Sequence, residues 1–408
     1  MIFGEPLSFY YSYIAFAMAV MTWILYWGIC KTDFLKQGLL FLASGAIVAV
    51  INLKLVSFEM VFLSSVALVG GGTLVYYWGK MVRNNPNLIK LLICIIITLS
   101  AMVYIKLLQP VMAQFSDFAQ IAVPVGISYY TFKMVHYLIE CSRGQFRENN
   151  LLTFLNYLYF FPMFLSGPIE RYNNFYPQSQ NIEYKRADMA MGLERIMIGL
   201  IQKIIISDMI ISAFLLPSLY MEPGATQLSW NILLFASFAK FMSLYFDFAG
   251  YTSLAIGIGY FFGYKLMENF NFPLLRSTLA EFWRNWHISL SSWARDYVYF
   301  PILMKYKMPN VALVCTMLTI GAWHSILPGW ILWGFHHGFG LVLLSIYQRN
   351  IVKFEFLNQF RSTVAWRYIS VPIVWWYVSL GYSLTMKAES LDGAVSNYLT
   401  IITFGLVS

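Results

Sequence analysis

Long apolar runs separated by short polar connections fill most of the sequence. A membrane-spanning helix needs about 20 consecutive, mostly apolar residues. The runs that approach this length are residues 11–30, 38–53, 57–78, 88–108, 119–141, 151–168, 190–216, 229–262, 309–327, 329–348 and 367–386, with 394–407 as a last candidate. Together they predict about 11–13 membrane segments, some of them short or re-entrant.

The run 229–262 is too long for one helix that stands upright in a bilayer. We therefore expect it to be tilted, broken at Gly250 or divided into two segments. No repeat or soluble domain interrupts the pattern, and the longest polar loop, 169–189, is short. The sequence thus predicts an all-α, polytopic protein with one integral membrane domain over residues 1–408.

Composition strengthens this interpretation. Hydrophobic residues make up 59% of the chain and charged residues only 11%, whereas a soluble domain carries about 25% charged residues. The 13 Trp and 28 Tyr also suit a protein that crosses two membrane interfaces. The formal charge of +8 is dispersed among apolar runs, so we expect membrane lipid and not nucleic acid as a partner.

The basic residues instead predict orientation, because Lys and Arg are enriched in cytoplasmic loops. Three groups follow the first, third and fifth runs: Lys31 and Lys36; Lys80, Arg83 and Lys90; Arg143 and Arg147. Placing all three groups in the cytoplasm puts the N-terminus outside. The start has no basic region and carries Glu5, so we expect the first run to be a retained span rather than a cleaved signal. The four cysteines form no CxxC pair, and no zinc helix or other metal site is indicated.

His337 lies in an apolar run, GWILWGFHHGFGLVLL, that is interrupted only by glycines and by His336. Ionisable groups at membrane depth are costly and are candidates for function. Gly334 and Gly338 share one helix face, where a neighbouring backbone can approach closely. His336 points about 100° away, so the two histidines cannot serve one cavity equally. The context alone leaves a packed histidine and a functional one equally open.

The segment 281–299, EFWRNWHISLSSWARDYVY, has helical periodicity. Arg284, His287, Ser291 and Arg295 share a polar face, and Trp283, Trp286, Leu290, Trp293 and Tyr297 form an aromatic face. The pattern fits an interfacial amphipathic helix. It fits equally well a re-entrant helix that lines a buried aqueous pocket, with His287 as a second catalytic candidate.

Asp247 is the acid that lies well inside an apolar run, and it needs a partner, a proton or water there. Gly250 and Tyr251 follow it, which is consistent with a helix interruption beside a cavity. A structural role for Asp247 is as well supported as a functional one. His136, His324 and the loop 165–175, which contains Glu170 and Arg171, favour structural roles.

Five segments, in order, resemble the signatures of membrane-bound O-acyltransferases. They are VPVGISYYTF (123–132), FLSGPIERYNNF (164–175), YFDFAGYTSLAIGIG (245–259), ENFNFPLLRSTLAEFWRNWHISLSSWARDYVY (268–299) and GAWHSILPGWILWGFHHG (321–338). The resemblance implies a catalytic core over 123–340, with peripheral transmembrane helices at 1–110 and 350–408. It also implies a ring of helices around a central funnel.

The resemblance makes His337 the catalytic residue and His287 an accessory one. Our candidates for substrate binding are Asp247, Tyr251, Arg284, Trp286 and Ser291. The implied reaction takes an acyl group from a cytoplasmic thioester, an acyl-CoA or an acyl carrier protein, with no bound cofactor. The implied acceptor is an extracytoplasmic polymer or acceptor protein at the bacterial cytoplasmic membrane.

Two bacterial branches fit, one transferring D-alanine to teichoic acids and one transferring acetyl groups to alginate. ENFNFP and MKAESLDGA (386–394) favour the acetylating branch, whereas the chain length favours the D-alanylating one.

Two other functions suit a polytopic protein. A transporter or flippase of an envelope precursor would also bind its substrate at mid-membrane, but such proteins often have paired halves, and no second copy of DFAGY or WHISLS occurs. A scaffold for envelope proteins would leave His287 and His337 without a reason.

Overall fold

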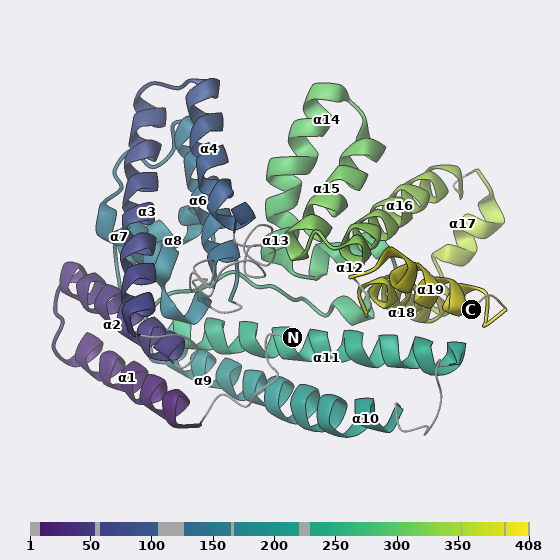
Figure 1. The fold of residues 1–408 in the computed structure, drawn as a ribbon, viewed down its shortest axis with the longest axis horizontal. Helices are drawn as coiled ribbons and strands as arrows, with labels where there is room; N and C mark the ends of the chain where they lie inside the picture. The colour runs from purple at the N-terminus through teal and green to yellow at the C-terminus, as the bar shows by residue number, and fades with distance from the viewer. Residues whose placement is uncertain are drawn as a thin grey trace. The chain divides into compact units, whose positions relative to one another are not determined.

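The computed structural model describes residues 9–53, 58–104, 126–164, 167–219, 229–351, 353–386 and 389–406. These residues are helical almost throughout, with one isolated bridge between Phe270 and Trp286. Parts of the predicted runs and motifs lie outside the described residues, namely 57, 105–108, 119–125, 165–166, 387–388 and 407. The all-α prediction is confirmed (Figure 1).

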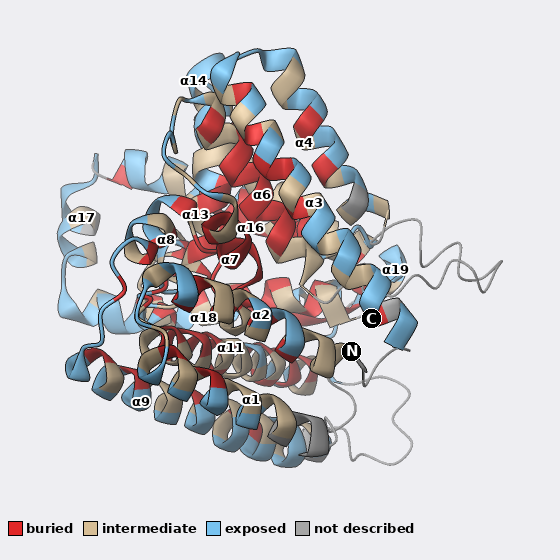
Figure 2. Ribbon diagram, turned by 90° about the vertical axis from the view of Figure 1, so that its left-hand side faces the viewer, coloured by how far each residue is buried: buried red, intermediate tan, exposed pale blue. Residues whose placement is uncertain are grey.

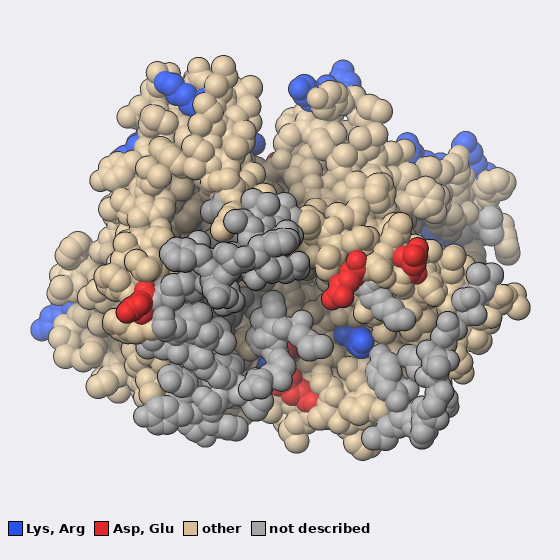
Figure 3. All heavy atoms as spheres, in the orientation of Figure 1, with Lys and Arg blue, Asp and Glu red and all other residues tan. Residues whose placement is uncertain are grey.

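Helix length and surface character support a membrane protein. Among the described residues, six helices are long and apolar enough to cross a bilayer: Asp33–Asn52, Val61–Asn84, Arg186–Leu215, Trp230–Phe261, Pro328–Ile351 and Val364–Met386. Shorter apolar helices cover Ile14–Gly28, Leu88–Ser100 and Leu151–Met163. Uncharged residues dominate the face shown in Figure 3, and large apolar side chains such as Leu42 and Phe62 are exposed. Lipid is the solvent in which such a surface is stable. The number of crossings stays a prediction.

The described chain groups into two compact units. The first comprises residues 1–197 and 252–267, and the second comprises 198–251 and 268–408. Helices α9 (Arg186–Leu200) and α11 (Trp230–Phe261) contribute residues to both units. The other elements of the first unit are α1 (Phe9–Gly28), α2 (Asp33–Leu53), α3 (Phe58–Asn84), α4 (Leu88–Val103), α6 (Ile127–Ser142), α7 (Leu151–Tyr159), η3 (Phe161–Met163) and α8 (Tyr172–Ser179).

The first unit is built around an aromatic core. Helices α6 and α7 are largely buried, whereas α1, α3 and α4 expose much of their surface (Figure 2). The Phe175 and Tyr264 rings stack at 4.5 Å. Glu170 anchors the loop before α8, because its carboxylate accepts N–H groups of Arg171 at 2.9 Å, Asn174 at 3.0 Å and Met267 at 2.8 Å. This agrees with the structural role favoured for that loop.

The second unit contains the C-terminal helices. Its elements are η4 (Ile201–Leu215), a π-helix, then α10 (Leu216–Leu219), η5 (Pro273–Leu275), α12 (Leu279–Asn285), α13 (Ile288–Ala294), η6 (Arg295–Tyr299), α14 (Phe300–Tyr306), α15 (Pro309–His324), α16 (Pro328–Ile351), α17 (Glu355–Arg361), α18 (Val364–Met386) and α19 (Leu391–Ile402). Glycines let α15 and α16 pack closely. A Cβ atom on Gly334 would lie 2.8 Å from the Met317 carbonyl oxygen, and one on Gly338 would lie 3.0 Å from the Val314 Cα. The predicted close approach at this glycine pair is confirmed.

Helix α11 is continuous, so two of the three alternatives for this run, a break at Gly250 and a division into two segments, are wrong. The tilt stays a prediction. Gly250 instead allows a close helix contact. A Cβ atom there would lie 2.8 Å from the backbone nitrogen of Lys203 and 2.9 Å from the carbonyl oxygen of Gly199. Small residues at membrane helix contacts commonly serve this purpose.

Candidate active site

His287 lies at a backbone break between α12 and α13. Its φ of 44° and ψ of 53° are in the left-handed region, which a helix cannot continue through. The backbone on either side bonds instead to a neighbouring extended segment: Ile288 N–H donates to Asn269 at 2.9 Å, and Asn271 N–H donates to Asn285 at 3.1 Å. The single helix expected over 281–299 is therefore wrong.

The side chain of Asn269 orients His287. Its Oδ1 atom accepts the Ser289 N–H at 3.4 Å and lies 3.3 Å from His287 Nδ1. An oxygen acceptor at that distance requires the proton on Nδ1, which leaves a lone pair on Nε2. Nε2 is buried and has no partner among the described atoms. Burial, and to a lesser degree the neighbouring His324, lowers the pKa of His287 well below its usual value. The imidazole is therefore a neutral acceptor.

Helix α16 presents different residues on different faces. Trp330, Trp333 and His337 recur at intervals of three and four residues, so they share one face. Gly334 and Gly338 face α15, as described above. One face of α16 therefore packs closely against α15, and another face holds His337 together with the two tryptophans.

The adjacent histidines have different environments. His336 stacks on Tyr377 with ring centroids 4.0 Å apart, and its Nε2 lies 3.0 Å from the Tyr377 carbonyl oxygen. Its Nδ1 lies 3.0 Å from the Tyr398 hydroxyl. His337 is fully buried, and neither of its ring nitrogens has a partner among the described atoms. Two unpaired buried nitrogens are costly unless a substrate or water meets them.

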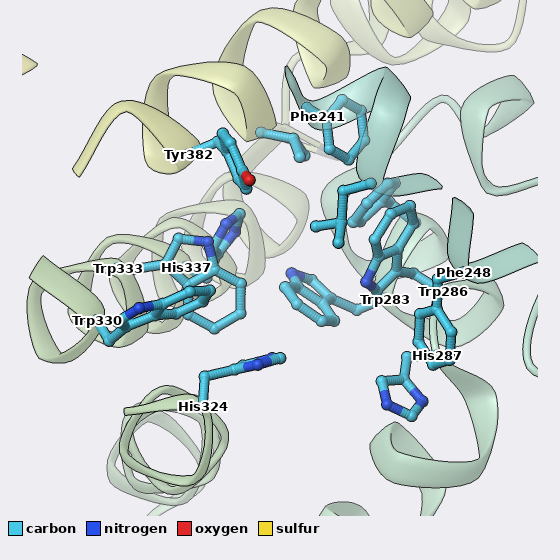
Figure 4. Close-up of a pocket in the computed structure, with 13 residues that line it drawn as sticks. Phe241, Phe248, Trp283, Trp286, His287, His324, Trp330, Trp333, His337 and Tyr382 are labelled. Atoms are coloured by element: carbon cyan, nitrogen blue, oxygen red, sulfur yellow. The ribbon is translucent and has the colours of Figure 1, made fainter. Parts of the chain in front are cut away.

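Both candidate catalytic histidines line one cavity of about 70 Å³ in the second unit. Figure 4 shows the Trp283 indole between the imidazoles of His287 and His337. The lining residues come from α11, α12, the break after it, α15, α16 and α18: Phe241, Leu244, Phe248, Phe282, Trp283, Trp286, His287, His324, Trp330, Trp333, His337, Val378 and Tyr382.

Aromatic rings hold the imidazole of His337 in place. The ring centroids of Trp333 and Trp283 lie 4.7 Å and 5.1 Å from it, both in edge-to-face geometry. Helix α18 closes another side, since a Cβ atom on Gly381 would lie 3.0 Å from His337 Nε2. The result is a site shaped by aromatic rings around an imidazole that has no partner among the described atoms.

The predicted substrate-binding residues fall into two sets. Trp286 lines the cavity. Asp247 pairs with Lys203 at 2.6 Å, and the Tyr251 ring lies 5.4 Å from the Lys203 ammonium, so both belong to the contact between α11 and η4. Arg284 is exposed and bonds to the Ala280 carbonyl, and the Ser291 hydroxyl donates to the Trp286 carbonyl. These four residues do not line the cavity.

Several cavity residues were not among the candidates. His324, favoured above as structural, ends α15 and stacks on Trp330 at 4.7 Å inside the cavity. The interval between Trp330, Trp333 and His337 could have revealed the cavity face of α16. Val378 and Tyr382 share a face of α18, but nothing in the sequence connects that helix to α16. Among the described residues, no group of three or more His, Cys, Asp or Glu could hold a metal ion.

Residues 78–387 match the profile of MBOAT, the membrane-bound O-acyltransferase family. The chain belongs to this family. Within it, the chain is 32% identical over 293 residues to the probable alginate O-acetylase AlgI of Pseudomonas aeruginosa, covering 70% of this chain and 52% of that protein. The residues that line the cavity all lie within the part of the chain that matches this family.

Two other relatives of the chain have names that refer to other polymers. The teichoic acid D-alanyltransferase of Bacillus subtilis is 31% identical over 274 residues, covering 63% of this chain and 67% of the relative. The peptidoglycan O-acetyltransferase of Helicobacter pylori is 30% identical over 310 residues, covering 67% and 55%. The chain spans about half the length of several of these relatives.

Proposed function

We propose that this chain is an O-acyltransferase that modifies hydroxyl groups of an extracytoplasmic cell-envelope polymer. The observation that carries the proposal is His337, buried in an aromatic cavity with both ring nitrogens unpaired among the described atoms. Membership of the acyltransferase family and the polymers named for three relatives support it.

In the proposed reaction, neutral His337 takes the proton of an acceptor hydroxyl as the oxygen attacks a thioester carbonyl. The new C–O bond forms, the C–S bond breaks, and the imidazolium returns the proton to the departing thiolate. The products are an ester and a free thiol. His287, with its Nε2 lone pair directed by Asn269, can accept a second hydrogen bond and orient the acceptor.

The donor in this proposal is an acyl thioester, an acyl-CoA or an acyl carrier protein, that reaches the enzyme from the cytoplasm. A substrate bound between the surrounding rings displaces water from the cavity, which strengthens each polar contact and protects the thioester from hydrolysis. The acceptor is on the opposite side of the membrane, so the acyl group crosses the bilayer during transfer.

Mass spectrometry of acyl groups released by mild base from envelope polymers tests this function. We expect a released acyl group in cells with the wild-type chain and its loss in cells with His337→Ala at equal membrane abundance. Unchanged release would contradict the proposal. Movement of an envelope precursor across vesicles without acyl transfer would instead support a transporter or flippase.

A further inference from the structure

The walls of the cavity carry no fixed charge among the described residues. Aromatic, aliphatic and imidazole side chains make up the lining, and the carboxylates on the same elements are bound elsewhere. On α11, Asp247 pairs with Lys203 at 2.6 Å. On α12, Glu281 accepts the Ser277 N–H at 3.3 Å and the Ser277 hydroxyl at 3.1 Å.

Helix α11 keeps its acid away from the cavity by its periodicity. Phe241, Leu244 and Phe248 face the cavity at intervals of three and four residues. The next face carries Ser243 and Asp247, which contact η4 through Ser207, Ser212 and Lys203. The helix therefore separates an uncharged cavity wall from a polar helix contact.

This arrangement distinguishes the two acyl groups that relatives of this chain transfer by name. A D-alanyl group carries an ammonium, and burying a cation without an anion costs several kcal/mol. An acetyl group has no charge and needs only a hydrogen-bond donor for its carbonyl oxygen. An ammonium bonded to an unpaired nitrogen of His337 would also occupy the lone pair that the reaction needs.

The indole rings do not replace a carboxylate. An ammonium is attracted to an open aromatic face. The face of Trp330 is stacked against His324 with an interplanar angle of 21°, and Trp333 contacts Trp283 at 5.6 Å and His337 at 4.7 Å. One face of the Trp330 indole is therefore covered by His324, and Trp333 packs edge to face with two other rings, which reduces the aromatic surface open to an ammonium.

We propose that the cavity accepts a short neutral acyl group, acetyl, and discriminates against D-alanyl through the charge of the ammonium. The proposal rests on the acyltransferase function proposed above. The cavity lining selects the acyl group in this proposal, whereas the acceptor polymer is selected on the outer side of the protein.

Acyl transfer from three pantetheine thioesters, measured in membrane vesicles that contain the full chain, distinguishes the effect of the acyl group's charge from the effect of its size. Acetyl is small and neutral, isobutyryl is neutral and matches D-alanyl in shape, and D-alanyl is charged. We expect acetyl transfer to acceptor polymer to exceed D-alanyl transfer by at least about 100-fold, with isobutyryl faster than D-alanyl. D-alanyl transfer equal to or faster than isobutyryl transfer overturns the proposal.

A variant pair adds a gain-of-function test. Leu244→Asp places a carboxylate on the cavity wall, and Leu244→Asn places a neutral group of the same shape there. Only the Asp variant should narrow the ratio of isobutyryl to D-alanyl transfer, and equal ratios in both variants count against the proposal. If the Asp variant does not fold, the wild-type comparison still decides.

The His337→Ala variant distinguishes failure of the selectivity from failure of the function. D-alanyl transfer that depends on His337 and is at least as fast as isobutyryl transfer refutes the acetyl assignment and retains the acyltransferase. Transfer of no thioester by the wild type, or equal transfer by wild type and variant, refutes both proposals.

Discussion

Single residues decide which of two adjacent histidines can do chemistry. His336 is held by Tyr377 and Tyr398, whereas His337 faces the cavity with unpaired nitrogens. Gly381 on α18 allows both imidazoles to take these positions, because it leaves room beside them. A Cβ atom on Gly381 would lie 2.7 Å from His336 Cδ2 and 3.0 Å from His337 Nε2.

Gly381→Ala should therefore displace both imidazoles. We expect a loss of stability of about 1–3 kcal/mol, typical of overpacking, and a fall in acyl transfer of at least about tenfold, because small misplacements of a catalytic group are costly. Thermal unfolding in detergent and the thioester assay measure the two effects. Gly70→Ala in α3 is the matched control, since its Cβ would meet nothing within 4 Å. A Gly381→Ala enzyme with wild-type activity would contradict this account.

The left-handed backbone at His287 costs free energy, and a functional imidazole explains why a residue with a side chain occupies this position. Residues with a side chain lose about 1–2 kcal/mol in the left-handed region, and glycine does not. We expect His287→Gly to be more stable than His287→Ala by about 1 kcal/mol, although both lack the imidazole and should transfer acyl groups slowly. Equal thermal stability of the two variants would show that the left-handed backbone is not maintained.

At the level of elements, helix contacts in a membrane depend on small residues and polar pairs. Helix α11 meets η4 through Gly250 and through Lys203, which pairs with Asp247 at 2.6 Å and with Asp208 at 2.8 Å. Since Phe241, Leu244 and Phe248 line the cavity from the same helix, this contact fixes the register of one cavity wall. We therefore expect Asp247 to act through α11 and not on the substrate.

The two partners of this ion pair should differ in importance. Lys203→Met leaves two carboxylates near each other without a cation. Because these side chains are partly exposed, we expect a cost of about 1–3 kcal/mol, between the values for exposed and buried pairs. Asp247→Asn leaves Lys203 paired with Asp208, so its cost should be smaller. Thermal unfolding in detergent ranks the variants, and the opposite order would remove the support for this role of Lys203.

The apolar helices could be predicted from sequence, because hydrophobic spacing depends on local pattern. The local pattern around His337 left a packed and a functional histidine equally open, and the family resemblance selected His337 and His287. The end of the helix at His287 could not, since it depends on hydrogen bonds to Asn269 and Asn271 from another segment. The break at Gly250 stayed one of three alternatives for a related reason: a glycine in an apolar helix fits a break and a close contact equally well. The cavity residues of α18 required the tertiary structure.

At the scale of the whole molecule, the chain combines membrane helices with a cavity that holds two histidines and carries no fixed charge on its described lining. The first unit supplies an aromatic core and the second unit supplies the cavity. Residues 78–387, which match the acyltransferase family, include every residue that lines the cavity. Acyl transfer should therefore depend on residues of the second unit.

The most direct test is the single-turnover rate of acyl transfer from a radiolabelled thioester to acceptor polymer in membrane vesicles. The wild type and the Gly70→Ala control should transfer at equal rates. His337→Ala should be slower by about 100-fold to 10,000-fold, the usual contribution of a general base. A His337→Ala protein that is correctly folded and transfers at the wild-type rate would contradict the central claim.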